Sequence, residues 1–381
     1  MKVIKIGTVA LLFSGVLCFQ TQAYETAARN AILMDFDTGE YLFEKNIEES
    51  VPPASMSKLM TVYILMSKIK DGSIKLDDTF SVSENAWRKG GAATGGSTMF
   101  LSIGDNVSVE NLIKGIVIQS GNDACIVVAE NISGSEEDFA ILMNKTAQKL
   151  GLKNSSFANS TGLPHPDQKM SMEDLAILSH HIIQEFPDLY HYFSEKEFTY
   201  NNIKQGNRNP LLYSMKEADG LKTGHTEEAG FCLAASAVKK GRRLIGVMSG
   251  MNSNKERSEE AERLMNWGFR EFNNYKLFTK GQVIATSKVW YGKEKTVDLI
   301  VQDDVLKTIH LSQVDNVKTT AEFDEPVKAP IKEGQQIGEL KISINGQLPL
   351  TVPLLASKNI SKVGLLGRFW ANIKYFVFGA K

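Results

Sequence analysis

The chain has 381 residues, of which 43% are apolar, 9% aromatic and 23% charged, with 30 glycines and 10 prolines. This composition excludes a disordered, collagen-like or fibrous chain. The length suits two domains, because single hydrophobic cores stop growing at about 250 to 300 residues. The formal net charge of −1 leaves no bulk field to recruit nucleic acid. Charge is unevenly spread, since residues 1–23 carry +2, residues 358–381 carry +5 and everything between them carries −8.

The first residues have the pattern of a secretory signal peptide. Two lysines precede an apolar run at 7–19, and small residues lead up to Ala23. We therefore expect residues 1–23 to be removed and the mature chain to be exported. A buried first helix is disfavoured because the run lacks caps and is too short to cross a bilayer. Lipoprotein processing at Cys18 is disfavoured because the bulky Leu17 precedes it.

The chain between the ends predicts a mixed α/β (α+β) domain with helices around a sheet, followed by a small all-β domain. Residues 28–45 alternate around a turn and predict a β-hairpin. From about residue 278 the pattern changes to short alternating segments, with Asn345-Gly346 as a hairpin turn. The 3.6-residue periodicity predicts helices after Pro52-Pro53 and at 108–118, 122–132, 136–150, 172–185 and 257–273, with strands at 231–238 and 243–249.

Residues 358–381 predict an amphipathic helix. Apolar residues recur at spacings of three and four from Val363 to Val377, and Arg368 falls on the opposite side. Basic residues interleaved with Trp and Phe suit a helix lying in a membrane interface. The lysines and arginine interrupt every window long enough to span a bilayer. We expect a membrane anchor here, and a terminal helix docked on the protein's own surface is the alternative.

The mature chain would keep two cysteines, Cys125 and Cys232, which are 107 positions apart. Neither lies in a CxxC or Cys/His spacing, so a structural zinc site is not expected. Two alternatives stay open from the sequence, namely a single disulfide and two small buried thiols.

Three short motifs carry candidate chemistry: Ser55-x-x-Lys58, Ser120-Gly121-Asn122 and Lys222-Thr223-Gly224. Each alone has an ordinary structural explanation as a helix cap or a turn. Their order is more informative. A serine begins a buried helix, a second serine begins another helix, and the third motif enters a strand. Serine acyl-transfer enzymes have such motifs in the same order along the chain.

The first motif also makes chemical sense by itself. Positions i and i+3 lie on one face of a helix, so the amine of Lys58 can reach the hydroxyl of Ser55. A lysine activates a serine only when it is uncharged, and burial together with a second cation, for which Lys222 is the candidate, lowers a lysine pKa. At a helix N-terminus the unpaired N–H of Ser55 can donate to a developing oxyanion.

With these motifs, Asp219–Thr226 and Ser120–Cys125, the chain from about residue 24 to its end resembles the low-molecular-mass penicillin-binding proteins. These are the serine-type D-alanyl-D-alanine carboxypeptidases of peptidase family S11. The resemblance implies a β-lactamase/transpeptidase-like domain with an antiparallel sheet at 24–277, the all-β domain at 278–357 and the anchor helix at 358–381. It implies a periplasmic enzyme attached to the inner membrane through that helix.

The resemblance also implies roles for the site residues. Ser55 is the nucleophile and Lys58 its base, Ser120 passes a proton to the leaving D-alanine, and Asn122 orients Lys58 and the substrate amide. The remaining implied contacts to substrate come from Lys222, Thr223, Gly224, from the N–H of His225 as second oxyanion donor, and from Arg257 at the terminal carboxylate. The glycine-rich segment 90–96 lacks a P-loop ending and is expected to be a flexible loop near the site.

The expected activity is removal of the terminal D-alanine from peptidoglycan stem pentapeptides, with penicillin acylating Ser55. No cofactor, no metal and no nucleic acid are expected. A β-lactamase is disfavoured because no ExxxN-like segment lies between the second and third motifs. D,D-endopeptidase action on crosslinks stays open. An inactive, membrane-tethered wall-binding scaffold is the alternative from another class, and a scaffold has no need of an intact nucleophile and base.

Overall fold

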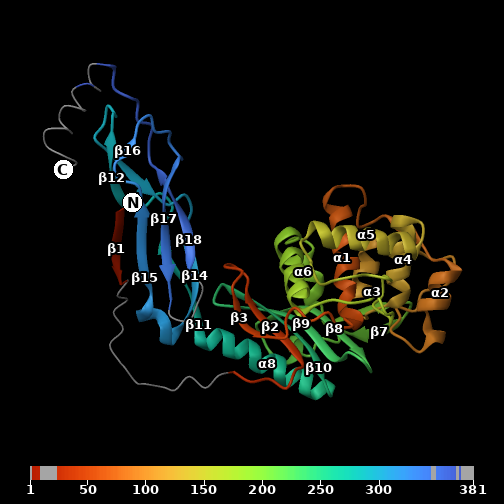
Figure 1. Cartoon of the computed structure of the whole chain (residues 1–381). Helices are drawn as coiled ribbons and strands as arrows, with labels where there is room; N and C mark the ends of the chain where they lie inside the picture. Colours follow the sequence, from red (N-terminus) through yellow and green to blue (C-terminus); the bar gives the residue numbers. More distant parts are fainter. Residues whose placement is uncertain (1, 9–23, 345–348, 366–368, 370–381) are drawn as a thin grey trace. The chain divides into compact units, whose positions relative to one another are not determined.

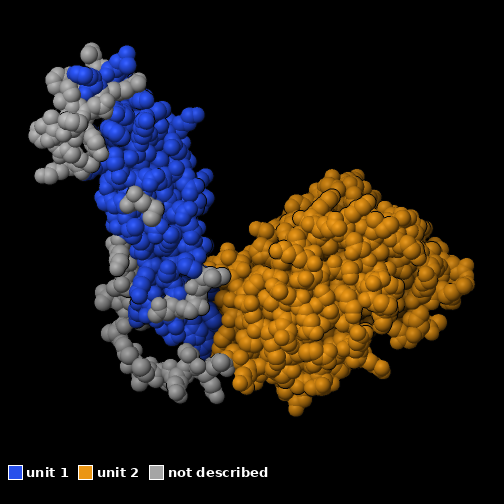
Figure 2. All heavy atoms as spheres, in the orientation of Figure 1, with its two compact units in different colours: residues 1–22, 271–381 blue, residues 23–270 orange. Residues whose placement is uncertain are grey.

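The structure is a computed structural model that describes residues 2–8, 24–344, 349–365 and 369. The chain forms two compact units (Figures 1 and 2). One comprises residues 23–270, and the other comprises residues 1–22 together with 271–381. Each unit has a hydrophobic core of its own.

The larger unit is built on a five-stranded antiparallel sheet in the order β3-β2-β10-β9-β8 (Figure 1). The hairpin predicted at 28–45 supplies β2 and β3. The third motif lies on β8, the last strand in this order, which pairs with β9 along one edge and with no further strand among the described residues. The strands are β2 Asn30–Asp35, β3 Tyr41–Lys45, β8 Ala218–Thr226, β9 Gly230–Lys239 and β10 Arg242–Met251.

Both faces of this sheet are buried, because successive side chains of a strand point to opposite sides. On β2, Ile32 and Met34 belong to the core that the helices share. Ala31 and Leu33 belong to a second core that includes Leu264 of α8. This burial on both faces explains why the central strands are continuous apolar runs. The packed sheet in turn supports β8, which carries the third motif.

Helices cover the sheet, and the helix bounds agree with the periodicity to within a few residues except at α2 and α7, which were not predicted from the sequence. Ser83, Ser108, Ser135 and Ser171 cap four of the helices by accepting a backbone N–H. The helices are α1 Lys58–Lys70, α2 Glu84–Gly90, α3 Val109–Val117, α4 Asn122–Ser133, α5 Glu136–Lys149, α6 Met172–Glu185, α7 Leu211–Ser214 and α8 Asn254–Glu271. Two small hairpins complete the unit, β4 Thr79–Ser81 with β5 Asn106–Ser108 and β6 Glu197–Tyr200 with β7 Ile203–Gly206.

The helix α1 is the centre of the core, with nine of its 13 residues buried. A helix that is buried all round is apolar all round, which is why the run after Lys58 shows no polar stripe. A short 3₁₀ helix, Ala54–Ser57, precedes it and carries Ser55. The nucleophile candidate therefore lies one turn before the α-helix that holds Lys58.

The smaller unit is β-rich, as predicted. Its seven-stranded sheet has the order β1-β15-β17-β18-β13-β12-β16, and β11 pairs with β14. Alternating residues such as Leu340, Ile342 and Leu354 form its core. The elements are β11 Phe272–Phe278, β12 Val283–Trp290, β13 Thr296–Ile300, β14 Val305–His310, a 3₁₀ helix Leu311–Asn316, β15 Lys318–Phe323, β16 Val327–Lys328, β17 Gln336–Ser343 and β18 Leu350–Ala356.

The fold prediction is confirmed for the antiparallel sheet flanked by helices and for the β-rich unit that follows. The predicted amphipathic helix at 358–381 and the Asn345-Gly346 turn lie largely outside the described residues. Lys2–Thr8, within the predicted signal peptide, forms β1 along β15. Among the described helices, none is both long enough and apolar enough to cross a bilayer.

Candidate active site

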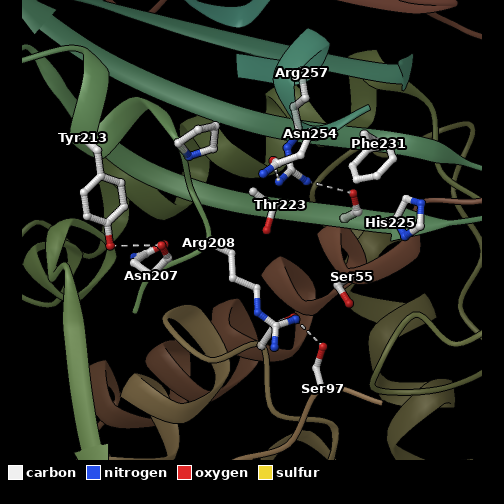
Figure 3. Close-up of a pocket in the computed structure, with 13 residues that line it drawn as sticks. Ser55, Ser97, Asn207, Arg208, Tyr213, Thr223, His225, Phe231, Asn254 and Arg257 are labelled. Atoms are coloured by element: carbon white, nitrogen blue, oxygen red, sulfur yellow. Dashed lines mark hydrogen bonds between the residues drawn. The ribbon is translucent and has the colours of Figure 1, made fainter. Parts of the chain in front are cut away.

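A cavity of about 670 Å³ is bordered by the 3₁₀ helix, by the loop before α4 and by β8 (Figure 3). Residues predicted from the sequence line part of it, namely Ser55, Ser120, Thr223, Gly224, His225 and Arg257. Residues that were not predicted line the rest, namely Ser97, Asn207, Arg208, Pro210, Tyr213, Phe231 and Asn254. Lys58, Asn122 and Lys222 are buried behind this surface.

Ser55 and Lys58 are in direct contact. The Nζ of Lys58 lies 2.9 Å from Ser55 Oγ and 2.5 Å from the carbonyl oxygen of Thr161. Lys58 is fully buried, so these two groups fix the direction of its amine. In its neutral form the amine keeps a hydrogen for Thr161 and turns its lone pair to the Ser55 hydroxyl, which is the arrangement a general base requires.

Gly162 allows the segment that carries the Thr161 carbonyl to lie close to the turn that carries Ser55. It has a left-handed φ of +78°, and a Cβ atom there would lie 2.0 Å from the carbonyl oxygen of Ala54 and 2.4 Å from Ser57 Oγ. Gly224 on β8 also lies close to the turn that carries Ser55, although with more space, since its Cβ would lie 3.0 Å from Pro53 O. Two glycines thus let the segment after α5 and the strand β8 pack against the turn that carries Ser55.

Ser120 and Lys222 form a second contact of the same kind. The Nζ of Lys222 donates to Ser120 Oγ at 2.9 Å and to the Thr223 carbonyl at 3.1 Å. Ser120 has a left-handed φ of 61°, which turns the chain just before α4 begins at Asn122. The structure thus brings the second and third motifs together.

The loop that precedes this helix is fixed by Asp123, which the sequence analysis did not single out. Its buried carboxylate accepts hydrogen bonds from Thr98 Oγ1 at 2.7 Å, Met99 N at 2.8 Å and Leu101 N at 3.1 Å. The N–H of Asn122 donates to Ser97 O at 2.8 Å. The second motif and the segment 97–101 therefore form one wall of the cavity.

The electrostatics of the site make the neutral form of Lys58 accessible near neutral pH. Burial, with a contribution from the charge of Arg208, lowers the pKa of Lys58 to about 8. Burial, followed by the charges of Lys58 and Arg208, lowers the pKa of Lys222 well below its ordinary value. At pH 7 a lysine with a pKa of about 8 is uncharged in roughly a tenth of the molecules. That fraction is sufficient for base catalysis near neutral pH.

Arg257 approaches the cavity from α8, on the far side of β8. Its Nη1 contacts the carbonyl oxygens of Gly224 and Cys232, each at 3.4 Å, and its Nη2 donates to Asn254 Oδ1 at 2.5 Å. Its guanidinium lies 5.5 Å from the ring centre of Phe231, and the residue is 6% exposed. Burial lowers the pKa of Arg257 to about 10, so the group stays charged at neutral pH.

Two family profiles match the chain. That of the D-alanyl-D-alanine carboxypeptidase family, peptidase S11, matches residues 18–253, and that of the penicillin-binding protein 5 C-terminal domain matches residues 272–362. The chain belongs to the D-alanyl-D-alanine carboxypeptidase family. The resemblance inferred from the three motifs is therefore confirmed.

Relatives of this carboxypeptidase family cover nearly the whole chain. The D-alanyl-D-alanine carboxypeptidase DacC of Escherichia coli is 41% identical over 92% of this chain and 88% of its own length. The crystal structure of penicillin-binding protein 5 from Haemophilus influenzae has a TM-score of 0.81 at 37% identity and covers 90% of this chain and 99% of its own. That of DacD from Francisella tularensis has a TM-score of 0.78 at 30% identity and covers 92% and 98%. The similarity thus includes the β-rich unit.

Several cavity residues of this family member could not be predicted as site residues. Arg208 follows the β6–β7 hairpin, and the only local signal around it is an Asn209-Pro210 turn. Ser97 follows the glycine-rich segment 90–96, whose first part forms the end of α2 and a 3₁₀ turn. The Nη1 of Arg208 donates a hydrogen bond to the hydroxyl of Ser97. The two residues are far apart in the sequence, so only the packing of the whole unit brings them together.

The two cysteines are free and buried in the structure. Burial raises the pKa of Cys125 to about 12 and that of Cys232 to about 11, so both are inert thiols at neutral pH. Within the described part of the chain, no group of three or more His, Cys, Asp or Glu side chains is placed to hold a metal ion.

Proposed function

We propose that this chain is a serine D,D-carboxypeptidase that removes the terminal D-alanine from peptidoglycan stem pentapeptides through an acyl-enzyme on Ser55. One observation carries the proposal: Ser55 Oγ lies 2.9 Å from a fully buried lysine amine of lowered pKa, at the wall of an open cavity. This is the geometry of an activated nucleophile.

Acylation follows from the two lysine–serine contacts. The neutral amine of Lys58 takes the proton of Ser55, whose oxygen forms a bond to the carbonyl carbon between the two D-alanines. The oxyanion accepts from the backbone N–H groups of Ser55 and His225. The C–N bond then breaks as Ser120 gives its proton to the leaving nitrogen, and Lys222, its 2.9 Å neighbour, returns a proton to Ser120. Lys58 releases the proton of Ser55 to water in the cavity and Lys222 takes one up from it, so both amines regain their starting state.

Deacylation repeats these steps with water. A water molecule gives a proton to the neutral amine of Lys58 as its oxygen bonds to the ester carbonyl carbon. The bond from that carbon to Ser55 Oγ then breaks, Lys58 returns the proton to Oγ, and the shortened peptide leaves with a free carboxylate. Penicillin would acylate Ser55 by the same attack, but its leaving nitrogen stays tethered in the opened ring. The adduct therefore persists, because the tethered group blocks the path of the water.

The direct test is release of D-alanine from diacetyl-lysyl-D-Ala-D-Ala by the wild type and by Ser55→Ala. The wild type should release D-alanine, and the variant should fall to background. Ser67→Ala serves as the matched control, because Ser67 belongs to a second SxxK spacing on α1, away from the cavity. Equal release by Ser55→Ala and the wild type would contradict the proposal.

A labelled-penicillin gel separates this activity from the rival functions. A stable adduct on Ser55 is expected for a carboxypeptidase. Rapid loss of the label with hydrolysis of the drug would instead indicate a β-lactamase, and no adduct at all would indicate a wall-binding scaffold. Release of crosslinked dimers to monomers would add D,D-endopeptidase action, which the same catalytic steps can perform.

The proposal includes a place in the cell. We infer that residues 1–23 direct export and are removed after Ala23, and that residues 358–381 attach the periplasmic enzyme to the inner membrane. The apolar run at 7–19 and the net charge of +5 on the tail support this. Fractionation of cells that express a variant ending at Ser357 tests the anchor, because retention of that variant on membranes would exclude it. Mass spectrometry of the mature N-terminus tests the cleavage.

A further inference from the structure

The direction of the Lys58 amine depends on one backbone group. Among the residues that the structure describes, Lys58 Nζ forms hydrogen bonds with Ser55 Oγ, at 2.9 Å, and with the carbonyl oxygen of Thr161, at 2.5 Å. Lys58 and Thr161 are both buried, so bulk water does not replace a misplaced carbonyl. Whatever holds the Thr161 carbonyl therefore also sets where the lone pair of the neutral amine points.

That carbonyl lies in a tight turn, residues 159–163, which the side chain of Asn159 closes. Asn159 Oδ1 accepts hydrogen bonds from Gly162 N at 2.7 Å, Thr161 Oγ1 at 2.9 Å and Thr161 N at 3.1 Å. Asn159 Nδ2 donates to the carbonyl oxygen of Leu163 at 3.0 Å. Asparagine builds a turn in this way because its side chain bonds to backbone groups a few residues ahead.

The N–H of Gly162 and the carbonyl of Thr161 belong to the same peptide group. A trans peptide group is planar, so its N–H and its C=O point in opposite directions. The 2.7 Å bond from Gly162 N to Asn159 Oδ1 therefore turns the Thr161 carbonyl away from Asn159 and towards Lys58. The left-handed φ of +78° at Gly162 lets the turn close without a Cβ atom.

Other contacts hold the neighbouring residue Ser160. Its hydroxyl and its N–H donate to Glu136 Oε1 on α5, at 2.7 and 3.1 Å. Its carbonyl oxygen accepts from Thr61 Oγ1 on α1 at 2.7 Å. These bonds place the turn between two helices, but they do not involve the peptide group between Thr161 and Gly162. The orientation of that peptide group is set by Asn159.

We propose that Asn159 is a positioning residue for the general base. Its side-chain oxygen holds the peptide group after Thr161 so that the carbonyl receives one hydrogen of Lys58 Nζ and the lone pair of that nitrogen faces Ser55 Oγ. The inference rests on the proposed function, in which Lys58 takes the proton of Ser55. Asn159 does not line the cavity and acts through this carbonyl alone.

Replacing Asn159 by alanine should change two features of the pH profile of acylation. Without its acceptor the peptide group after Thr161 can rotate, so the neutral amine loses its direction. The acylation rate on the high-pH plateau should then fall about 10- to 100-fold. The charged amine also loses a carbonyl partner, which lowers the pKa of Lys58 further below about 8 and moves the midpoint of the profile to lower pH.

The charged and titratable groups around Lys58 are the same in this variant. They come from α4, α5, β8 and the segment before α7, and they are Asp123, Cys125, Glu136, Arg208 and Lys222. A shift of the midpoint therefore reports on the contact between the amine and the Thr161 carbonyl.

The experiment is stopped-flow acylation by an excess of labelled penicillin between pH 6 and pH 10. First-order rate constants do not depend on the fraction of folded enzyme, so lost stability does not imitate the effect. Asn159→Asp keeps an oxygen that can accept from the turn and should restore most of the plateau rate. Asn144→Ala is the matched control, because Asn144 on α5 holds the same segment at Phe157, through bonds of 2.9 and 2.7 Å, and does not contact the turn. It should keep the plateau and the midpoint of the wild type.

Four results would overturn the inference. The first is a wild-type plateau in Asn159→Ala, and the second is a lower plateau whose midpoint stays near pH 8, since the carbonyl would then still contact the amine. The third is an equal loss in Asn144→Ala, which would assign the effect to packing of the whole segment. The fourth is an Asn159→Asp variant as slow as Asn159→Ala, which would assign it to the contact of Nδ2 with Leu163.

The same measurements separate this inference from the proposed function. If the wild type is acylated with a midpoint near pH 8 but releases no D-alanine from any peptide, the carboxypeptidase function fails, and the profile of Asn159→Ala still decides the role of Asn159. If the wild type shows no such midpoint, Lys58 is not the base, and the inference about Asn159 fails with it.

Discussion

Replacing Lys58 by methionine should change how the stability of the protein depends on pH. The folded-state pKa of Lys58 is lowered to about 8 by burial, against an ordinary value of 10.5. Below about pH 8 the folded protein holds a buried ammonium that is unfavourable. Between pH 8 and 10.5 the unfolded chain binds a proton that the folded chain lacks, so the free energy of unfolding of the wild type rises with pH.

The magnitude follows from the two pKa values, since each pKa unit corresponds to about 1.4 kcal/mol. The difference between the unfolding free energies of wild type and Lys58→Met should rise by about 3 kcal/mol from pH 7 to pH 10.5. Burial lowers the pKa of Lys222 in both proteins and cancels from the difference, whereas the contribution of the Lys58 charge to that pKa is lost in the variant and belongs to the measured effect. Methionine fills nearly the same volume without a charge, which keeps the packing of α1 similar.

Urea unfolding at several pH values measures the difference. Lys255→Met is the matched control, because the side chain of Lys255 is 83% exposed on α8 and its substitution should give a difference that does not vary with pH. If the Lys58→Met difference were also flat from pH 7 to 10.5, the amine would not be desolvated in the folded protein. The argument for a neutral base would then lose its physical cause.

Four further outcomes are expected. Gly162→Ala should destabilise the protein by at least about 2 kcal/mol and slow penicillin acylation, because left-handed backbone and contact with the nucleophile's turn oppose a Cβ; unchanged thermal unfolding would contradict this. Asp123→Asn should cost about 3 kcal/mol of unfolding free energy, since a carboxylate with several buried donors is lost; the check is urea unfolding at pH 7. The acylation rate of Ser55 should increase with pH through a midpoint near 8 as its base deprotonates; a stopped-flow profile without that midpoint would exclude the assignment. A reducing agent should leave the melting temperature unchanged, because Cys125 and Cys232 are unbridged; a decrease would indicate a disulfide.

The parts of the site that the sequence predicted are those set by local geometry. Ser55 and Lys58 are one helical turn apart, so their meeting needs only a helix at that place. The contact between Lys222 and Ser120 spans 102 residues, and it was inferred only through the resemblance to a family. Arg208 and Ser97 carry no motif, and their meeting depends on where the β6–β7 hairpin packs.

The fold shows the same division between local and long-range information. The helical periodicity of 136–150 and the alternation in 28–45 predicted where the elements lie, because both are properties of neighbouring residues. The order β3-β2-β10-β9-β8 places the first hairpin beside strands 200 residues later in the chain. That strand order depends on how the strands pair and on which elements cover the two faces of the sheet. The periodicity within one strand carries no information about its neighbours.

The two edges of the five-stranded sheet differ in how they avoid aggregation. A bare strand edge is a template on which another chain can polymerise. At β3 the edge is five residues long and includes Glu44 and Lys45, whose charges discourage such growth. The strand β8 instead borders the cavity with Thr223, Gly224 and His225, and Gly224 packs close to the 3₁₀ helix. An edge strand at a cavity can offer its main-chain N–H and C=O groups to an extended peptide, whereas the charged edge at β3 disfavours such pairing.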